Sequence, residues 1–317
     1  MTTGWPRELE VCRWEPVAEG VVLLEFRDPA DAPLAPWEPG AHLDLHTGAA
    51  GVRQYSLCGE PSDRYRYRIA VLLEPAGRGG SRWVHETVRV GDLVTVAAVR
   101  NNFRLAEAPE FLLVAGGVGI TPILPMIDSL AARGRPWQLL YGGRTRTSMA
   151  FADDLANRYG AKVALRPQDS SGLLDVEGFL SGAPPGTAVY ACGPEPLLRA
   201  AEDACATRPE LSLHLERFRS SERHDGDPSG AFEVELARSG EVIGVGPDES
   251  ILDALERRGH SLPNSCREGV CGTCETRVLS GEIEHRDDVL DEAERKAGDV
   301  MMICVSRCRG ERLVLDL

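Results

Sequence analysis

The sequence has no uninterrupted apolar segment long enough to cross a membrane. Its most apolar stretch, FLLVAGGVGITPILPMI at residues 111–127, is broken by glycines and prolines. The opening residues, MTTGWPRELEV, also lack the basic segment followed by an apolar run that marks an export signal. Neither membrane spanning nor export is therefore expected, and the cytoplasm is the predicted location.

Positive charge is scarce. The 317 residues include 35 Lys and Arg but 49 Asp and Glu, and the formal net charge of -14 argues against nucleic-acid binding. Residues 226–317 alone hold 20 acidic and 11 basic side chains, a net charge of -9. We expect this acidic segment to dock on a basic partner through residues such as Glu282, Glu284, Asp287 and Asp288.

The sequence also lacks an internal repeat. Its length of 317 residues predicts two or three domains of ordinary size. Residues 21–99 contain short apolar or alternating runs (VVLLEF, HLDL, RYRYRIAVLL, LVTVAA) separated by Pro, Gly and Asp clusters. Such a pattern is typical of strands joined by turns. It predicts an antiparallel barrel or sandwich.

The pattern of apolar residues changes near Phe111. Strand FLLVA leads through a glycine turn into a helical segment from about Pro122 to Ala132, and strands and helices then alternate as far as LSLHLER. This alternation predicts a parallel sheet with helices on both faces. The polar segment RSSERHDGDPSG, residues 219–230, is expected to be a linker. FEVEL and EVIGV then predict a hairpin, and SILDALERR an amphipathic helix.

Cysteines are not paired in the manner of a disulfide scaffold, because three of the nine lie within nine residues of a long chain. Cys266, Cys271 and Cys274 have C-x4-C-x2-C spacing, and Cys304 follows thirty positions later, as in plant-type 2Fe-2S ferredoxins. Gly269 and Gly272 permit unusual backbone angles in this loop.

Two alternatives to these cluster ligands stay open. A structural zinc site usually has two C-x2-C pairs, and the second pair is absent here. Cys308 is a rival fourth ligand, but VMMICVSRC places Cys304 in an apolar strand and Cys308 after two polar residues, which favours Cys304. Cys12, Cys58 and Cys205 stand alone and are expected to be small buried or semi-buried hydrophobes.

Two weak signals within the first domain suggest a flavin site. Arg53 and Tyr55 share one face of the strand RQYSL, and Ser56 points the other way. An arginine can pair with a phosphate while a tyrosine packs on a ring. Further on, the glycine turn GRGGS precedes the short helix RWVHETV, so that Ser81 is expected to cap a helix N-terminus suited to phosphate.

A nicotinamide signal follows the strand FLLVA. The turn AGGVGITP lies between a buried strand and a helix, the context required of a dinucleotide-binding turn, although it is not a complete G-x-G-x-x-G. Its Pro122 suits the first turn of a helix. YACGP ends another strand and should lie at the same carboxyl edge of the sheet. Arg144 is placed to meet the adenosine ribose.

Taken together, RQYSL, GRGGS, AGGVGITP, YACGPEP and SCREGVCGTC resemble, in order and spacing, the phthalate dioxygenase reductase family, which includes the vanillate demethylase reductases. The resemblance implies a flavin-binding β-barrel (residues 1–105), a ferredoxin-reductase-type α/β nucleotide domain (106–222) and a plant-type ferredoxin of β-grasp fold (223–317). It also implies FMN, NADH and a 2Fe-2S cluster as cofactors. We expect the protein to be a monomer.

The resemblance assigns roles to individual residues. The implied catalytic residues are Ser56, Cys192, Glu216 and Phe218, with the aromatic ring of Phe218 beside the flavin. The expected cofactor-binding residues are Arg53, Tyr55, Ser56, Leu57, Val71, Leu72, Gly79, Gly80, Ser81, Gly117, Gly119, Thr121, Pro122, Arg144, Cys192, Gly193, Pro194 and Phe218. Gly142-Gly143-Arg144-Thr145-Arg146 offers two arginines and no acid, which leaves room for NADPH.

The sequence has no C-x-H pair for a Rieske centre and no evident two-histidine, one-carboxylate iron site. His42, Asp44 and His46 share a strand face, but strand alternation accounts for them equally well. Oxygen chemistry is therefore expected on a separate oxygenase, either a Rieske or a haem-thiolate protein. A flavin would link two-electron NADH to a one-electron cluster. The alternatives are a non-enzymatic iron-sulfur carrier or sensor and a self-contained flavin monooxygenase.

Overall fold

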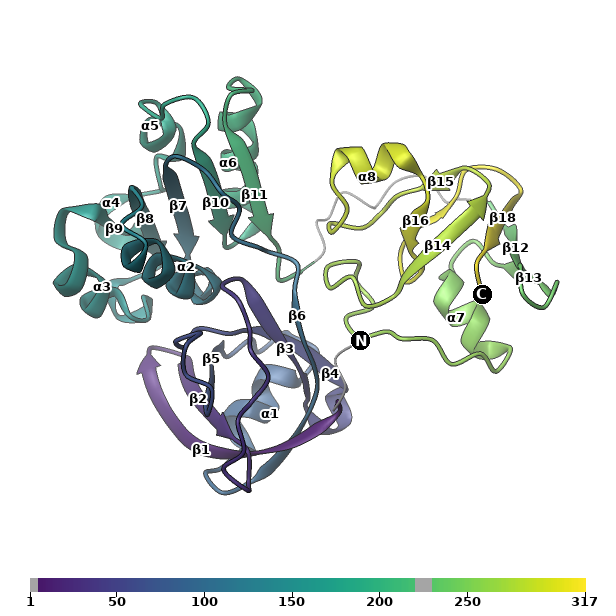
Figure 1. Cartoon of the computed structure of the whole chain (residues 1–317), viewed down its shortest axis with the longest axis horizontal. Helices are drawn as coiled ribbons and strands as arrows, with labels where there is room; N and C mark the ends of the chain where they lie inside the picture. Colours follow the sequence, from purple (N-terminus) through teal and green to yellow (C-terminus); the bar gives the residue numbers. More distant parts are fainter. Residues whose placement is uncertain (1–4, 220–229) are drawn as a thin grey trace. The chain divides into compact units, whose positions relative to one another are not determined.

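The computed structural model of the chain describes residues 5–219 and 230–317 and divides into two structural units (Figure 1). The first unit ends at Glu216 and contains an antiparallel sheet and a parallel sheet. The second begins at Arg217 and contains a mixed sheet. Most of the expected linker, residues 219–230, lies outside the described residues. The domain boundaries at 105/106 and 222/223 stay predictions.

The antiparallel sheet has the strand order β4-β3-β6-β1-β2-β5. Its edge strands meet because Leu57, just after β4, bridges to Ile69 of β5, and the N-H of Cys58 donates to the carbonyl of Arg68 at 2.9 Å. The sheet thus closes into the expected barrel. Its elements are β1 (Arg7–Ala18), β2 (Val21–Arg27), β3 (Ala41–His46), η1 (Gly48–Ala50), β4 (Val52–Ser56), β5 (Tyr67–Leu72), α1 (Gly80–Glu86) and β6 (Leu93–Asn101).

Strand β1 was not expected from the sequence. Leu9 and Val11 are fully buried in the barrel core, but charged residues alternate with them and Pro16 lies near the strand's end. The apolar residues of β1 are therefore few in the sequence and are separated by charged residues. Pairing with β2 and β6 supplies the hydrogen bonds that make this segment a strand.

The parallel sheet has the order β11-β10-β7-β8-β9. The glycine turn after β7 makes a 3-10 turn and begins α2 at Ile120, two residues before the expected start. The elements are β7 (Phe111–Gly116), η2 (Gly117–Gly119), α2 (Ile120–Ala132), β8 (Trp137–Gly143), η3 (Arg146–Ser148), α3 (Ala152–Tyr159), η4 (Gly160–Lys162), β9 (Val163–Pro167), α4 (Gln168–Ser171), α5 (Val176–Leu180), β10 (Ala188–Cys192), α6 (Glu195–Ala206) and β11 (Ser212–Glu216).

Helices cover both faces of this sheet, as the sequence predicts. One core cluster joins the sheet to α2 and α3, and a second joins its other face to α5 and α6. The carboxyl ends of all five strands consequently share one open edge, where ligands of such sheets bind.

The barrel and the parallel sheet pack on each other within the first unit. Val21, Cys58, Ala70 and Ala150 form a small buried cluster from both domains. The N-H of Glu19 also donates to the carbonyl of Thr147 at 2.9 Å. These contacts hold the end of β4 and the carboxyl edge of the parallel sheet in one body.

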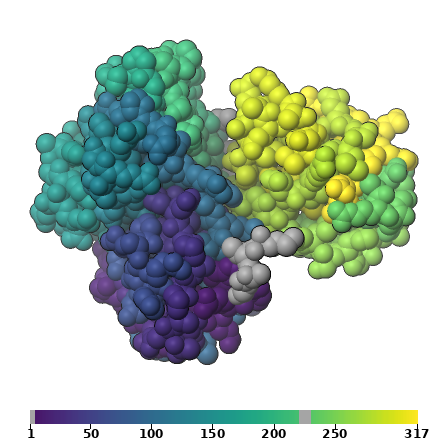
Figure 2. All heavy atoms as spheres, in the orientation of Figure 1, coloured from purple at the N-terminus to yellow at the C-terminus, as the bar shows by residue number. Residues whose placement is uncertain are grey.

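The second unit is a mixed β-grasp sheet of order β13-β12-β18-β14-β16, in which β12 and β18 run parallel. Its core is a single apolar cluster, and Figure 2 shows its atoms in green to yellow as one packed body. The elements are β12 (Phe232–Leu236), β13 (Val242–Val245), α7 (Ile251–Arg257), β14 (Glu275–Ser280), β15 (Ile283–Glu284), α8 (Glu292–Ala297), β16 (Val300–Met302), β17 (Arg307–Cys308) and β18 (Arg312–Leu315).

The hairpin and helix that the sequence predicts here are confirmed as β12-β13 and α7. Among the residues that the structure describes, no helix is long and apolar enough to cross a membrane.

Candidate functional site

The four expected cluster ligands come together from two segments of the second unit. Cys266, Cys271 and Cys274 lie between α7 and β14, Cys304 follows β16, and all four are buried. Hydrogen bonds from Cys271 and then Cys304 to the Cys266 sulfur lower the pKa of that thiol. Cys304 also lowers the pKa of Cys274 by hydrogen bonding. Four converging thiols fit a 2Fe-2S cluster.

One detail of the sequence interpretation is wrong: Cys304 does not lie in a strand. Strand β16 ends at Met302, and Cys304 occupies the turn that follows, where its side chain can face the cysteine loop. Cys308 lies in β17 opposite Ile283, where burial raises the pKa of its thiol. The geometry thus groups Cys304, and not Cys308, with the three loop cysteines.

The cysteine loop depends on residues with positive φ. Gly269 and Gly272 both have φ of +70°, as the sequence predicts, and Arg267 has φ of +58°. A Cβ on Gly269 would lie 2.6 Å from Cγ2 of Val305, so the close packing also requires glycine. The backbone N-H of Glu268 donates to the Cys266 sulfur at 3.3 Å. Such amides stabilise charge on sulfur.

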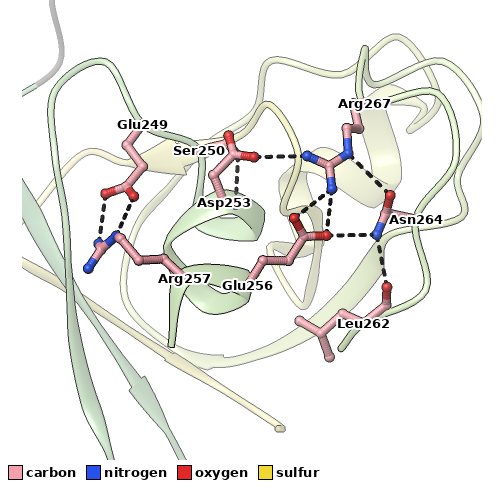
Figure 3. Close-up of polar contacts among 8 residues, drawn as sticks. All are labelled: Glu249, Ser250, Asp253, Glu256, Arg257, Leu262, Asn264 and Arg267. Atoms are coloured by element: carbon pink, nitrogen blue, oxygen red, sulfur yellow. Dashed lines mark hydrogen bonds and ion pairs between the residues drawn. The ribbon is translucent and has the colours of Figure 1, made fainter. Parts of the chain in front are cut away.

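Helix α7 holds this loop through Arg267 (Figure 3). The Arg267 guanidinium donates to Asp253 at 3.0 Å and to both oxygens of Glu256 at 2.5 and 2.6 Å. Its Nε also donates to Asn264, and Asn264 donates in turn to Glu256 at 3.1 Å. We call these four residues the α7 clamp. It fixes the backbone immediately after Cys266.

Asp287 is not a docking residue. Its side chain is fully buried, and its carboxylate accepts hydrogen bonds from the N-H groups of Val289 and Leu290 at 3.2 and 2.9 Å. The N-H of the next residue, Asp288, donates to the carbonyl of Gly269 at 2.9 Å. This part of the expected acidic docking surface therefore supports the cysteine loop. A buried carboxylate is held here by amides that the sequence pattern does not show.

The expected flavin residues of the barrel lie where β4 meets α1. A Cβ on Gly80 would lie 2.5 Å from Cγ of Arg53 and 3.2 Å from the Tyr55 hydroxyl, so only glycine lets the helix approach the strand. The Arg53 guanidinium donates to the carbonyl of Arg78 at 3.0 Å. Burial raises the pKa of Tyr55 to about 12, while Arg53 and Arg78 oppose the shift. Two cations beside a half-buried tyrosine fit a flavin phosphate and ring.

The sequence analysis gives Arg78 no role, although a cation in the glycine turn GRGGS is a usable signal for a phosphate. The expectation that Ser81 caps α1 is wrong. Gly79, in the left-handed conformation, is the N-cap of α1, and Ser81 lies inside the helix. The Ser81 hydroxyl instead accepts a hydrogen bond from the N-H of Glu74 at 3.0 Å.

The other residues expected to contact the flavin, Leu57, Val71 and Leu72, pack against apolar clusters of the first unit. Leu57 and Val71 belong to the barrel core, so their side chains face inward. The Val71 carbonyl contacts Nε2 of His85 at 2.9 Å. Leu72 packs against the cluster between the two domains.

Asp44, on strand β3, takes part in a network of polar contacts within the barrel. Its carboxylate accepts hydrogen bonds from Arg100 and Gln54, each at 2.9 Å.

The two nucleotide turns contact each other backbone to backbone. A Cβ on Gly119 would lie 2.2 Å from the carbonyl oxygen of Cys192, and one on Gly116 would lie 2.7 Å from Cδ of Pro194. The sequence prediction that YACGP reaches the edge beside AGGVGITP is confirmed by this packing. Gly117 has φ of +55°, and the carbonyl of Gly117 accepts from the Tyr141 hydroxyl at 3.2 Å.

The other residues expected to contact the nucleotide lie in or beside helices α2 and α6 and strand β8. The Thr121 hydroxyl is buried and donates to the carbonyl of Val118 at 2.9 Å. Pro122 lies in the first turn of α2, as expected. Pro194 is the N-cap of α6, and Gly193 precedes it. Arg144 is exposed just past β8.

Three of the four expected catalytic residues meet at the junction of the two domains. Ser56 ends β4, whereas Cys192 and Glu216 end β10 and β11 and lie opposite each other in the sheet. The Ser56 hydroxyl donates to Oε2 of Glu216 at 3.4 Å, and the Cys192 thiol donates to the same oxygen at 3.9 Å. We call these three residues the junction triad. The fold thus brings Ser56 into hydrogen-bonding contact with Glu216, which lies 160 positions further along the chain.

Burial dominates the electrostatics of the junction triad. It raises the pKa of Glu216 to about 8, with hydrogen bonds from Ser56 and Cys192 opposing the shift. Burial, followed by the charge of Glu216, raises the pKa of Cys192 well above its usual range. Phe218 belongs to the second unit and is 41% exposed. Its expected packing beside the flavin stays a prediction.

Comparisons with known proteins agree with this arrangement. The family model of the 2Fe-2S iron-sulfur cluster binding domain matches residues 234–309, and that of the oxidoreductase NAD-binding domain matches residues 113–203. The chain is 44% identical over 302 residues to the phenoxybenzoate dioxygenase subunit beta of Ectopseudomonas oleovorans, which covers 95% of this chain and 94% of that relative.

Two solved structures are also similar over nearly the whole chain. Phthalate dioxygenase reductase is 36% identical, with a TM-score of 0.73, and the match covers 99% of this chain and 98% of that one. An intact type IV self-sufficient cytochrome P450 monooxygenase is 42% identical, with a TM-score of 0.92, over 98% of this chain. This chain spans 41% of the length of that monooxygenase.

Proposed function

The chain belongs to the phthalate dioxygenase reductase family, and from that premise we propose that it passes electrons from NADH through FMN and a 2Fe-2S cluster to a separate oxygenase. It is a flavin and iron-sulfur oxidoreductase with a nicotinamide-binding domain and a 2Fe-2S domain. The observation that carries the proposal is the convergence of Cys266, Cys271, Cys274 and Cys304 in the same chain as the junction triad.

The barrel residues suit FMN. We infer that Arg53 and Arg78 bind the flavin phosphate beside the first residues of α1, and that the half-buried Tyr55 packs against the ring. Gly80 keeps the helix close enough to the strand for these groups to meet. A bound flavin supplies the ability to take two electrons from the nicotinamide and release them one at a time.

The junction triad orients the reactants. Ser56 belongs to the flavin-side barrel, and Cys192 and Glu216 belong to the nucleotide side, so the three are suited to bring the nicotinamide ring against the flavin and exclude water there. With a pKa of about 8, Glu216 holds its proton at neutral pH. A neutral carboxyl does not repel the anionic nucleotide, and it keeps the Ser56 hydroxyl in place. Phe218 is proposed to cover the flavin until the nicotinamide arrives.

The electron acceptor is proposed to be a terminal oxygenase, which docks on this protein through a basic surface. Relatives are named as dioxygenase and cytochrome P450 proteins, so a Rieske or a haem-thiolate acceptor is proposed. Of the expected docking acids only Asp287 is buried, so Glu282, Glu284 and Asp288 stay in the proposal. Two exposed acids are added to them, Glu275, which directly follows Cys274, and Asp299. Partial desolvation of its carboxyl group, followed by the charges of Glu294 and Asp299, raises the pKa of Glu275. We further propose a monomer in the cytoplasm.

The test combines spectroscopy with one matched pair of cysteine variants. In the purified protein, NADH should bleach both the flavin bands and the broad cluster absorbance, and a one-electron acceptor should restore them. Cys304→Ser should abolish bleaching of the cluster while flavin bleaching continues, because its thiolate is a ligand. Cys308→Ser, also buried but outside the cysteine group, should retain both.

Absent flavin, with the cluster intact, would reject the reductase in favour of an iron-sulfur carrier or sensor. Oxidation of an organic substrate without a second protein would instead indicate a self-contained monooxygenase.

A further inference from the structure

Asp287 is the one buried acid of the second unit within residues 230–317, and its side chain is fully excluded from solvent. It lies outside the group of four cysteines. Burying a carboxylate is unfavourable unless polar groups surround it. The groups around Asp287 therefore indicate what the residue does.

The backbone at Asp287 packs against the cysteine loop. A Cβ on Gly269 would lie 3.1 Å from Cα of Asp287 and 3.3 Å from its Cβ. The N-H of Asp288 donates to the carbonyl of Gly269 at 2.9 Å. Gly269 lies between the ligands Cys266 and Cys271 in the chain. These contacts therefore hold the middle of the segment that joins two cluster ligands.

The carboxylate of Asp287 reaches the turn that carries the fourth ligand. Its Oδ1 accepts a hydrogen bond at 3.3 Å from the hydroxyl of Ser306, which is fully buried two residues after Cys304. The same hydroxyl accepts from the N-H of Arg286 at 3.1 Å. The N-H of Ser306 donates to the carbonyl of Met302 at 2.9 Å and closes the turn around Cys304. Asp287 thus connects both segments that carry ligands.

The positive groups near Asp287 do not cancel its charge in the interior. Arg295 of α8 approaches Oδ2 only to 3.9 Å, and its side chain is 38% exposed. Nδ1 of His285 lies 3.7 Å from Oδ1. Burial lowers the pKa of His285, against the opposing effect of Asp287, so this imidazole is neutral at neutral pH. Hydrogen bonds, more than ion pairs, therefore hold the carboxylate in place.

We propose that Asp287 is a positioning residue of the 2Fe-2S cluster, which joins the cysteine loop to the Cys304 turn and whose buried charge lowers the reduction potential of the cluster. The inference rests on the cluster of the proposed function and adds a residue outside its ligands that tunes it. A fixed negative charge disfavours the arrival of an electron, and it acts most strongly where solvent is excluded. A lower potential makes the cluster, once it holds one electron, a stronger donor to the oxygenase.

The charge is tested with Asp287→Asn in the holoprotein. This variant keeps the shape of the side chain and one oxygen for the N-H groups of Val289 and Leu290, but it removes the charge. In a titration with dithionite and mediator dyes, its cluster should have a more positive potential than the wild type. At a fixed potential, the ratio of reduced to oxidised cluster should rise at least about threefold, which corresponds to about 28 mV for one electron.

The connection between the two segments is tested with Ser306→Ala, which keeps the charge of Asp287. Loss of iron to a chelator should become at least about fivefold faster, because a buried carboxylate oxygen and the N-H of Arg286 both lose a partner. Two matched variants are the controls. Glu292→Gln removes an exposed charge that pairs with Lys296 on α8, and Ser239→Ala removes a hydroxyl from the turn between β12 and β13. Neither control should change the potential or the rate of iron loss.

An unchanged potential in Asp287→Asn, or unchanged iron loss in Ser306→Ala, would overturn the inference, and so would equal effects in the controls. Should Asp287→Asn fail to assemble the cluster, iron loss from Ser306→Ala decides alone. Neither measurement uses NADH, so both judge Asp287 separately from the reductase activity. A wild-type protein that holds no cluster would reject the proposed function, and the inference would fall with it.

Discussion

At the scale of single residues, Glu216 has the clearest pH signature. Burial raises the pKa of its carboxyl group to about 8 from an ordinary value of 4.5. Between those values the folded protein binds a proton that the unfolded chain has released, so the stability falls as the pH rises from about 4.5 to about 8. The junction triad therefore opposes folding most at alkaline pH, where the half-buried Glu216 must ionise.

Glu216→Gln should remove this dependence. The variant should gain stability over the wild type between about pH 4.5 and 8, by up to about 5 kcal/mol, because the pKa rises from 4.5 to about 8 and one pKa unit corresponds to about 1.4 kcal/mol. Urea unfolding followed by tryptophan fluorescence measures the effect in the first unit, since all five tryptophans precede residue 217. Glu177→Gln, at an exposed glutamate of α5, is the control. Parallel pH profiles for wild type and Glu216→Gln would show that the carboxyl is not buried.

At the scale of elements, α7 and the cysteine loop form a pair that the α7 clamp joins. Ser250 caps the helix, and its side chain accepts from the N-H of Asp253 at 3.1 Å. The helix thereby presents Asp253 and Glu256 to Arg267 in a fixed arrangement (Figure 3). Because Arg267 adopts a left-handed conformation next to Cys266, the clamp compensates for an unfavourable backbone.

Arg267→Ala should loosen the cysteine loop without unfolding the module. We expect iron loss to a chelator to become roughly fivefold faster, which corresponds to about 1 kcal/mol. Arg267→Lys should restore part of the effect, because lysine keeps the charge but not the planar fork.

Arg257→Ala is the matched control, since Arg257 pairs with Glu249 and does not touch the loop. Equal iron loss from Arg257→Ala and Arg267→Ala would assign the effect to the helix as a whole.

At the scale of the whole molecule, electron entry and exit are separate. The junction triad lies in the first unit and the cysteine cluster in the second, so a change at the exit surface need not affect flavin reduction. In the proposed function, the acidic character of residues 226–317 serves the exit. Charge at a docking surface mainly changes the rate of encounter with the partner and its salt dependence.

Glu275→Gln/Asp299→Asn should therefore slow transfer to an oxygenase partner by roughly threefold to tenfold at low salt and flatten the salt dependence. Reduction of the cluster by NADH should stay within about twofold in stopped-flow measurements. Glu311→Gln, an exposed acid on another turn of the module, is the control. Equal slowing of both steps would mean that this surface serves the flavin contact or the fold.

Much of the architecture follows from the sequence because its signals are local. Glycine turns, strand periods and the C-x4-C-x2-C spacing depend on neighbouring residues, and they suffice for the barrel, the parallel sheet, α7 and the four cysteines. The meeting of AGGVGITP with YACGP also follows, because parallel strands share one carboxyl edge.

The tertiary structure decided what depends on distant residues. Asp287 carries the same charge whether it faces solvent or accepts amide hydrogen bonds, and only packing buries it. Ser81 became an interior helix residue because Gly79 takes the left-handed cap. The raised pKa of Glu216 was likewise invisible, because burial depends on which strands become neighbours and not on the order of residues along the chain.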